Sequence, residues 1–387
     1  MRLISKSIFG TSLVLAASGA AAQSSVTLYG VADTFIQYLD NGGKHSYSER
    51  SGGSAGSQFG LKGTEELGGG VNAVFDVETG FNINNGTYFA DSNTMFYRQS
   101  WVGLKSDAYG QLSFGRQYQP SFWAVYFTDP FRGNEVMSPL AAADLAGATD
   151  RSTLATQYVA GRTSNSIVYI SPDMRGARFY AMYALASTVS QPIAVASGNM
   201  LDLAVNYSGY GFYAALAYQF QHGGRETAPL VPSAPSLLTS FDLMATEHYT
   251  AALAYRWGIV NFQANYSYNR SKDVPDGAVV SITPALKVPL SMLVHSYSIA
   301  EVGATIQATP VDVIEIAGIQ RQVRGVHDNT WGIEVGADHN ISKRTSFYMR
   351  AGYMKNNGGA NMSWPGVSGV AAGSKQVVGV LGMTHRF

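Results

Sequence analysis

The feature that most constrains this chain is a two-residue alternation of apolar and polar side chains that recurs along most of its length. In VNFQANYSYNR at 260–270, apolar or aromatic residues hold the even positions up to 268, and Asn, Gln and Ser hold the odd ones. Similar alternation occurs at 71–78, 201–208, 248–257 and 331–340. A period of two is typical of a β-strand whose two faces meet different surroundings. Because carboxylates, amides and an arginine lie in mid-strand, one face must meet water.

Short and long connections alternate between the expected strands. Seven short ones, rich in Gly, Pro and Asp, lie at about 66–70, 106–110, 172–176, 208–211, 257–258, 308–310 and 341–344. Eight long ones lie at about 40–56, 81–95, 118–163, 187–199, 222–247, 271–294, 322–329 and 355–375. Together they would join sixteen strands. Strands of roughly 9 to 13 residues are long enough to cross a lipid bilayer at a tilt.

An even number of strands, with short turns at one end and long loops at the other, predicts an all-β fold. We expect a 16-stranded antiparallel transmembrane β-barrel with short periplasmic turns and long external loops. Closure removes exposed strand edges, whose unpaired amides are costly in lipid. About sixteen strands enclose a water-filled channel, whereas about eight would be filled by side chains. The alternative, a soluble sandwich of two sheets, leaves the polar mid-strand faces unexplained.

The N-terminus has the pattern of a secretory signal peptide. Arg2 and Lys6 precede an apolar stretch, and the small residues at 20–22 precede Gln23. The apolar stretch is shorter than the ~20 residues that a spanning helix needs. We therefore predict a leader at 1–22 and a single barrel domain at 23–387.

Composition excludes several classes of function. The 26 basic and 26 acidic residues leave no basic excess to neutralise phosphates, which argues against nucleic acid as a partner. The absence of cysteine excludes thiol catalysis, thiolate metal sites and disulfides. The seven histidines show no ligand spacing, so we predict no metal and no other cofactor.

Several stretches resemble the Gram-negative general-diffusion porins of β-proteobacterial type. They are VTLYGV at 26–31, SQFGLKGTEELGGGVNAVFDVETGF at 57–81, FYRQSWVGLKSDAYGQLSFGRQY at 96–118, NSI at 165–167 and GMTHRF at 382–387. The resemblance implies a passive, non-enzymatic diffusion channel for small hydrophilic solutes and ions in the bacterial outer membrane. It also implies a homotrimer, contact with outer-membrane lipid and lipopolysaccharide, and recognition of Phe387 by the barrel-assembly machinery.

The resemblance further implies that the third external loop, at 118–163, folds into the barrel and narrows it. The loop carries Phe122, Trp123, Tyr126, Phe127 and Phe131. A loop exposed to water would rarely hold so many aromatic residues, and packing against the inner wall would cover them.

Porins of this type oppose acidic residues of the inserted loop to basic residues of the wall. The loop candidates here are Asp129, Glu135 and Asp144, and the wall candidates are Lys62, Arg98 and Arg162. Strand parity puts Lys62 on the lumen face, and Arg98 as well if Trp101 points to lipid. Opposed charges create a transverse field that orients polar solutes. Gln58 replaces an arginine common in the family, which should make the constriction less attractive to anions.

Two other functions stay open. The barrel could act as an adhesin or receptor through its long loops, for which residues 222–247 and 271–294 offer enough length. It could also be a barrel hydrolase, since residues 52–56 match the Gly-x-Ser-x-Gly pattern. That pattern needs a preceding strand and a following helix to expose its serine, and here it lies in a Gly/Ser-rich loop.

Overall fold

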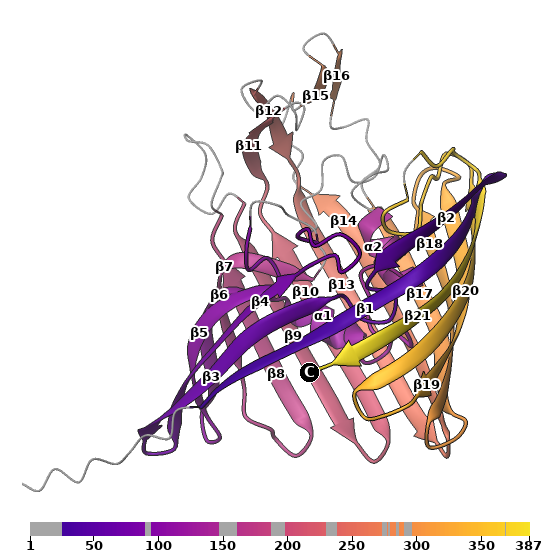
Figure 1. Ribbon diagram of the computed structural model, residues 1–387. Coiled ribbons are helices and arrows are strands. Elements are labelled where there is room, and N and C mark those ends of the chain that lie inside the picture. The colour runs from indigo at the N-terminus through magenta and orange to yellow at the C-terminus, as the bar shows by residue number, and fades with distance from the viewer. Residues whose placement is uncertain are drawn as a thin grey trace, which may run out of the picture.

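The computed structural model describes residues 25–89, 94–146, 161–186, 198–229, 238–272, 277, 279–283, 286–289, 296–367 and 369–387. The expected leader at 1–22 lies outside them. The barrel strands are β1 (Ser25–Asn41), β2 (Lys44–Ser51), β3 (Gln58–Gly68), β4 (Val71–Gly80), β5 (Gln99–Ser106), β6 (Gly110–Tyr118), β7 (Arg162–Ile170), β8 (Ala177–Ala184), β9 (Met200–Gly209), β10 (Phe212–Gln221), β13 (Ala245–Trp257), β14 (Val260–Lys272), β17 (Ser296–Gln307), β18 (Asp312–Val323), β19 (Asn329–Asn340), β20 (Thr345–Asn357) and β21 (Lys375–Arg386). Two hairpins, β11 (Gly224–Pro229) with β12 (Leu238–Leu243) and β15 (Val279–Thr283) with β16 (Leu286–Pro289), rise from the long-loop end (Figure 1).

The strands close into an antiparallel barrel because β1 pairs with β21 along one edge. Along its other edge β1 pairs with β2 near the external end and with β3 near the opposite end. β2 and β3 are therefore one interrupted strand, which gives the sixteen expected from the sequence. β1 runs diagonally across the whole wall (Figure 1). No helix among the described residues is long and apolar enough to cross a membrane.

The first external connection is shorter than the sequence predicts. The expectation of a loop over 40–56 is wrong, because β1 and β2 form a tight hairpin that turns at Gly42 and Gly43. Only residues 52–57 leave the sheet. The Gly and Ser composition of this segment gives no indication of the contacts that hold it in place.

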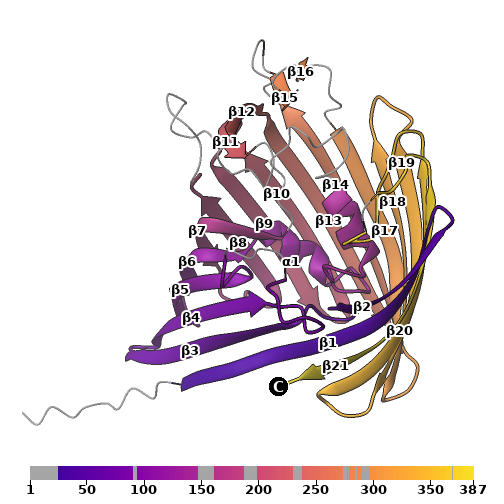
Figure 2. The same ribbon diagram turned by 45° about the horizontal axis from the view of Figure 1, so that its top comes forward.

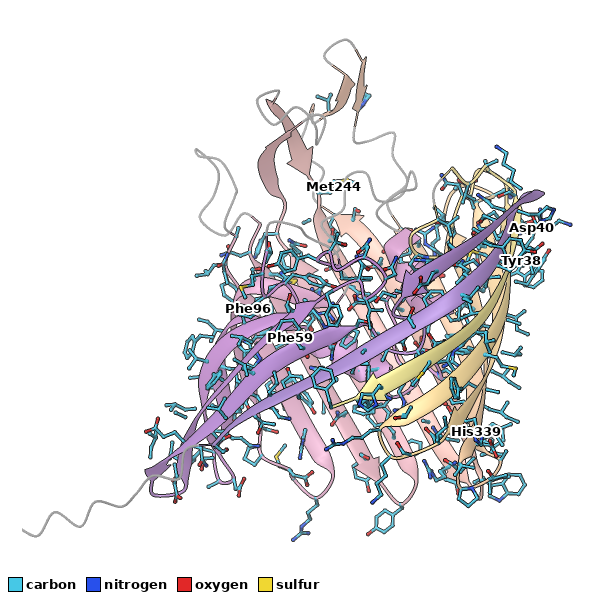
Figure 3. The ribbon with its side chains drawn as sticks, in the orientation of Figure 1. Tyr38, Asp40, Phe59, Phe96, Met244 and His339 are labelled. Atoms are coloured by element: carbon cyan, nitrogen blue, oxygen red, sulfur yellow. The ribbon has the colours of Figure 1, made fainter. Side chains whose placement is uncertain are left out.

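The two faces of the strands meet different surroundings, as the alternation predicts. On β13, Ala252 and Ala254 are 1% and 7% exposed, whereas the intervening Leu253 is 53% exposed. On β14 the side chains of Gln263 and Asn265 point to the interior and contact the inserted loop. Figure 3 shows the length of the wall: His339 lies near the short-turn end, and Tyr38 and Asp40 lie near the other.

The third loop folds into the barrel and carries two helices, α1 (Pro120–Tyr126) and α2 (Pro139–Ala146) (Figure 2). α1 packs through Ala124 on an alanine patch of the inner wall. This patch comprises Ala204, Ala215, Ala217, Ala252 and Ala254. Such small side chains leave room for the helix inside the barrel. α2 lies against β17, β18 and β19, where Ile299 and Ile319 face inward instead of polar residues.

The break between β2 and β3 is held by a buried carboxylate of β1. Asp33 is fully buried and accepts hydrogen bonds from the backbone amides of Gly53 (2.8 Å), Ser54 (3.1 Å) and Ala55 (3.0 Å). It also accepts the hydroxyl of Tyr348 at 2.6 Å. The Gly-x-Ser-x-Gly segment is therefore a backbone cradle for an anion of the same chain, rather than a turn that exposes a serine nucleophile.

Replacing Asp33 with alanine should lower the stability of the folded barrel. The change leaves the buried amide of Gly53, the partly buried amides of Ser54 and Ala55 and the buried Tyr348 hydroxyl without their acceptor. A buried donor without a partner costs about 1 to 3 kcal/mol. The unfolding midpoint in detergent, followed by the heat-dependent gel mobility, measures the loss. Asp40→Ala is the matched control, since Asp40 lies on the same strand and accepts the single amide of Gly43. Equal shifts for the two variants would contradict the assignment.

Candidate functional site: the waist of the barrel

Glu135 of the inserted loop joins two arginines of the wall. Arg98, just before β5, donates from Nη1 to the Glu135 carboxylate at 2.7 Å. Arg162, the first residue of β7, donates from Nη2 to the same oxygen at 2.5 Å. Arg98 also donates from Nε to Glu78 of β4 at 2.7 Å. Three of the residues predicted from the sequence thus meet in one cluster, which ties the loop to the wall.

Two tyrosines complete this cluster, and sequence reasoning did not identify them. Tyr97 donates its hydroxyl to the second oxygen of Glu135 at 2.7 Å. The Tyr118 hydroxyl accepts hydrogen bonds from both Arg98 and Arg162, and the Arg162 guanidinium lies over the Tyr118 ring at 4.4 Å. Tyr97 directly precedes Arg98, and Tyr118 ends the strand that carries Arg116. From the sequence alone, a tyrosine at a strand end is equally well explained by an interfacial aromatic belt.

The two arginines keep Glu135 ionised. Burial alone would raise the pKa of Glu135, but the charges of Arg162 and Arg98 outweigh it and lower the pKa to about 2. The carboxylate therefore keeps its negative charge at any pH that the cell surface meets. The cluster contains two fixed cations against the carboxylates of Glu135 and Glu78.

Arg116 reaches the same region through a β-bulge. By strict alternation Arg116 shares a face with Leu112 and Phe114, which predicts a position away from the cluster around Glu135. The register of β6 against β7 shifts, however, between Gly115 and Gln117. Gly115 has φ +132°, and a Cβ there would lie 2.2 Å from the Ser100 carbonyl oxygen, so only glycine fits. After the bulge, Arg116 turns inward and donates to Ser164 Oγ at 2.9 Å.

The other predicted residues lie elsewhere. Lys62 lies over the ring of Tyr29 at 5.0 Å and pairs in register with Asp76, toward the short-turn end from Glu78. Gln58 pairs in register with Gly80 of β4, on the long-loop side of Glu78. The side chain of Asp144, in α2, lies outside the described residues.

Asp129 is turned back into its own loop instead of facing the arginines. It is fully buried and accepts hydrogen bonds from the amides of Phe131 (2.8 Å) and Gly133 (2.6 Å) and from Ser138 Oγ (2.7 Å). Burial raises its pKa, and these hydrogen bonds oppose that shift. Asp129 therefore stabilises the conformation of its own loop.

The expectation that Trp101 points to lipid, from which an inward orientation of Arg98 follows by alternation, is wrong. Trp101 donates its indole N–H to Gln99 and pairs in register with Asp76, so it shares the lumen face and does not point to lipid. Val102 and Leu104, which are 58% and 50% exposed, form the outward face of β5. Arg98 still points inward because it precedes the strand, where strict alternation does not apply.

A family model for Gram-negative porins matches residues 10–359 of the chain. The chain belongs to the Gram-negative porin family. The porin is therefore a passive diffusion channel of the bacterial outer membrane, and the barrel with its inserted loop is the channel body.

Individual relatives agree with this assignment. The porin is 27% identical to outer membrane porin protein 32 of Delftia acidovorans over 97% of each chain. It is 33% identical to an outer membrane porin protein of Bordetella pertussis, over 47% of this chain and 48% of that one. Among solved structures, the anion-selective porin from Comamonas acidovorans superposes with a TM-score of 0.74 at 23% identity, covering 94% of this chain and all of that one. The last likeness establishes the fold.

Proposed function

We propose that the cluster of Arg98, Arg162 and Glu135 is the waist of the pore and that it sorts solutes by charge, with a preference for small anions. The single observation that supports this is the double ion pair of Glu135, which fastens the inserted loop to the arginine side of the wall. Arginines then lie along the narrowed water path with their charges fixed. Arg116, which turns inward beside this cluster, adds a third cation against the two carboxylates of Glu135 and Glu78. An excess of one sign among the lining charges raises the local concentration of the opposite ion.

Gln58 tempers this preference, since an arginine at that position would add a further cation near Glu78. Charges several Å from an ion in water are screened over roughly 8 Å at physiological salt. We therefore propose a moderate anion preference, in which each charge contributes a part. Reversal potentials in a KCl gradient across a planar bilayer test it, and a potential of the sign of a cation-selective pore would contradict it.

The remaining parts of the proposal concern assembly and chemistry. We propose that the pore is non-enzymatic, with no cofactor, and that it works as a homotrimer surrounded by lipid and lipopolysaccharide after recognition of Phe387 during assembly. The large apolar side chains exposed on the outward faces of most barrel strands support contact with lipid or with neighbouring subunits. Three equal conductance steps in single-channel recordings would support the trimer, and single independent steps would contradict it.

Glu135→Gln should increase anion preference by the same amount at pH 7 and at pH 4. A pKa lowered to about 2 means that the wild-type carboxylate stays charged above that value and loses its charge only as the pH falls through it. The difference in reversal potential between wild type and variant should therefore be constant from pH 7 to 4. A difference that fades with a midpoint near the ordinary glutamate pKa of about 4.3 would contradict the pairing.

A further inference from the structure

The waist opens into a cavity of about 540 Å³ on the long-loop side. Its lining includes Asn82, Phe89, Pro365 and Gly366 from the external connections, together with Glu135 of the waist. Arg162 of the waist and Arg116 beside it also line this space. Its volume lies within the range of sites that hold small organic ligands, so a small organic anion has room there.

Much of the lining is apolar, which is unusual for the wall of a water-filled channel. The apolar side consists of Phe89, Phe122, Val125, Tyr126, Val136 and Leu140. The rings of Phe122 and Tyr126 lie 5.8 Å apart, and Phe122 stacks on Tyr118 at 4.7 Å. Apolar surface held against water is unfavourable unless another apolar group covers it. The aromatic faces offer such a group a flat surface on which to stack.

The same cavity is also lined by cations. They are Arg50, Arg116 and Arg162, whereas Glu135 is the one carboxylate among the described lining residues. Arg50 is held in place by hydrogen bonds to Gln37 Oε1 (2.8 Å) and the Pro365 carbonyl (2.8 Å). It contacts no carboxylate in the described part of the chain. A guanidinium has five N–H donors, so Arg50 keeps donors for an anion in a fixed geometry.

We propose that this cavity binds small aromatic carboxylates on their way to the waist. The carboxylate would meet Arg50, and the ring would cover the apolar side around Phe89 and Phe122. The inference rests on the proposed function of the waist, because binding aids transport only if the pore also passes anions. It adds a solute class: an anion with an apolar ring, as distinct from small inorganic or aliphatic anions.

Block of the chloride current by added solutes tests the proposal in planar bilayers. Benzoate should reduce the KCl current at a concentration at which acetate, with the same charge and no ring, has little effect. Benzylammonium, with the same ring and the opposite charge, should not block. Block by acetate equal to that by benzoate, or equal block by benzylammonium, overturns the proposal. A preference for chloride without any block by benzoate would also overturn the proposal. That result would leave the proposed charge selectivity of the waist intact.

Two variants locate the site. Arg50→Gln should weaken the benzoate block about tenfold, because a charge-assisted hydrogen bond is lost. Phe89→Ser should weaken it while leaving the small effect of acetate unchanged. Arg178→Gln is the matched control, since Arg178 lines a separate cavity on the short-turn side and pairs with Asp173. If benzoate blocks both cavity variants as strongly as wild type, the site is not in this cavity. A heat-dependent mobility shift confirms that each variant folds.

Discussion

Replacing Arg98 and Arg162 together with serine is expected to convert the pore to cation preference and to widen it. The substitutions remove two fixed cations and leave the carboxylates of Glu135 and Glu78 uncompensated at the waist. A unit charge about 4 Å from an ion in water changes the energy of that ion by about 1 kcal/mol, which is roughly a fivefold change in its local concentration. Removing one cation raises the local concentration of cations and lowers that of anions, each by up to about fivefold, so each single variant should raise the cation-to-anion permeability ratio by up to about 25-fold, and the double variant by more.

Reversal potentials in a KCl gradient measure this ratio, and single-channel conductance measures the width. Arg178→Ser is the control, because it also removes an arginine from the interior but lies half exposed at the short-turn side, 3.5 Å from Asp173. We expect it to change the ratio little. Wild-type reversal potentials in both single variants and in the double variant would show that the waist lies elsewhere.

The sequence predicts the fold well wherever a strand separates water from an apolar environment. The alternation of β14 needs only the pleat, since neighbouring side chains point to opposite faces. It fails where the inserted loop covers the wall. Ile299 and Ile319 face inward under α2, and Ala252 and Ala254 do so under α1, so both faces of these strands are apolar or small. The residues of a strand alone do not predict that a loop distant in sequence will pack against that strand.

The sequence offers a set of candidate residues for the waist, but it does not indicate which of them meet in the fold. Asp129 and Glu135 lie six residues apart in one loop, and sequence alone gives them equal standing. Only the path of the loop decides that Glu135 reaches two arginines while Asp129 closes a turn. Arg116 shows the complementary failure, because one bulge at Gly115 reverses the parity on which its assignment depended.

The inward position of α1 depends on a second carboxylate of the wall. Asp202 of β9 is fully buried and accepts hydrogen bonds from the amide of Ser121 (3.1 Å), the hydroxyl of Ser121 (2.6 Å) and Gln219 Nε2 (3.0 Å). Tyr213 adds hydrogen bonds from its hydroxyl to carbonyls at the end of the same helix. Because most of the side chains that pack with Ala124 on this wall are alanines, the polar contacts supply much of the specific attachment of the helix.

Asp202→Ala should therefore release α1 for part of the time and make the pore wider and noisier. Losing two charge-assisted hydrogen bonds, at about 1.5 to 3 kcal/mol each, raises the detached population by about two orders of magnitude or more. Single-channel records should show a higher mean conductance with rapid fluctuations between levels, and the anion preference should fall because ions in a wider pore pass farther from the fixed charges. Asp202→Asn keeps one acceptor oxygen for Ser121 and should lie between the variant and wild type. Asp312→Ala, which removes an exposed carboxylate at the short-turn end, should leave the current unchanged. Quiet, wild-type currents from Asp202→Ala would mean that the Arg98–Glu135–Arg162 bridge alone holds the loop in place.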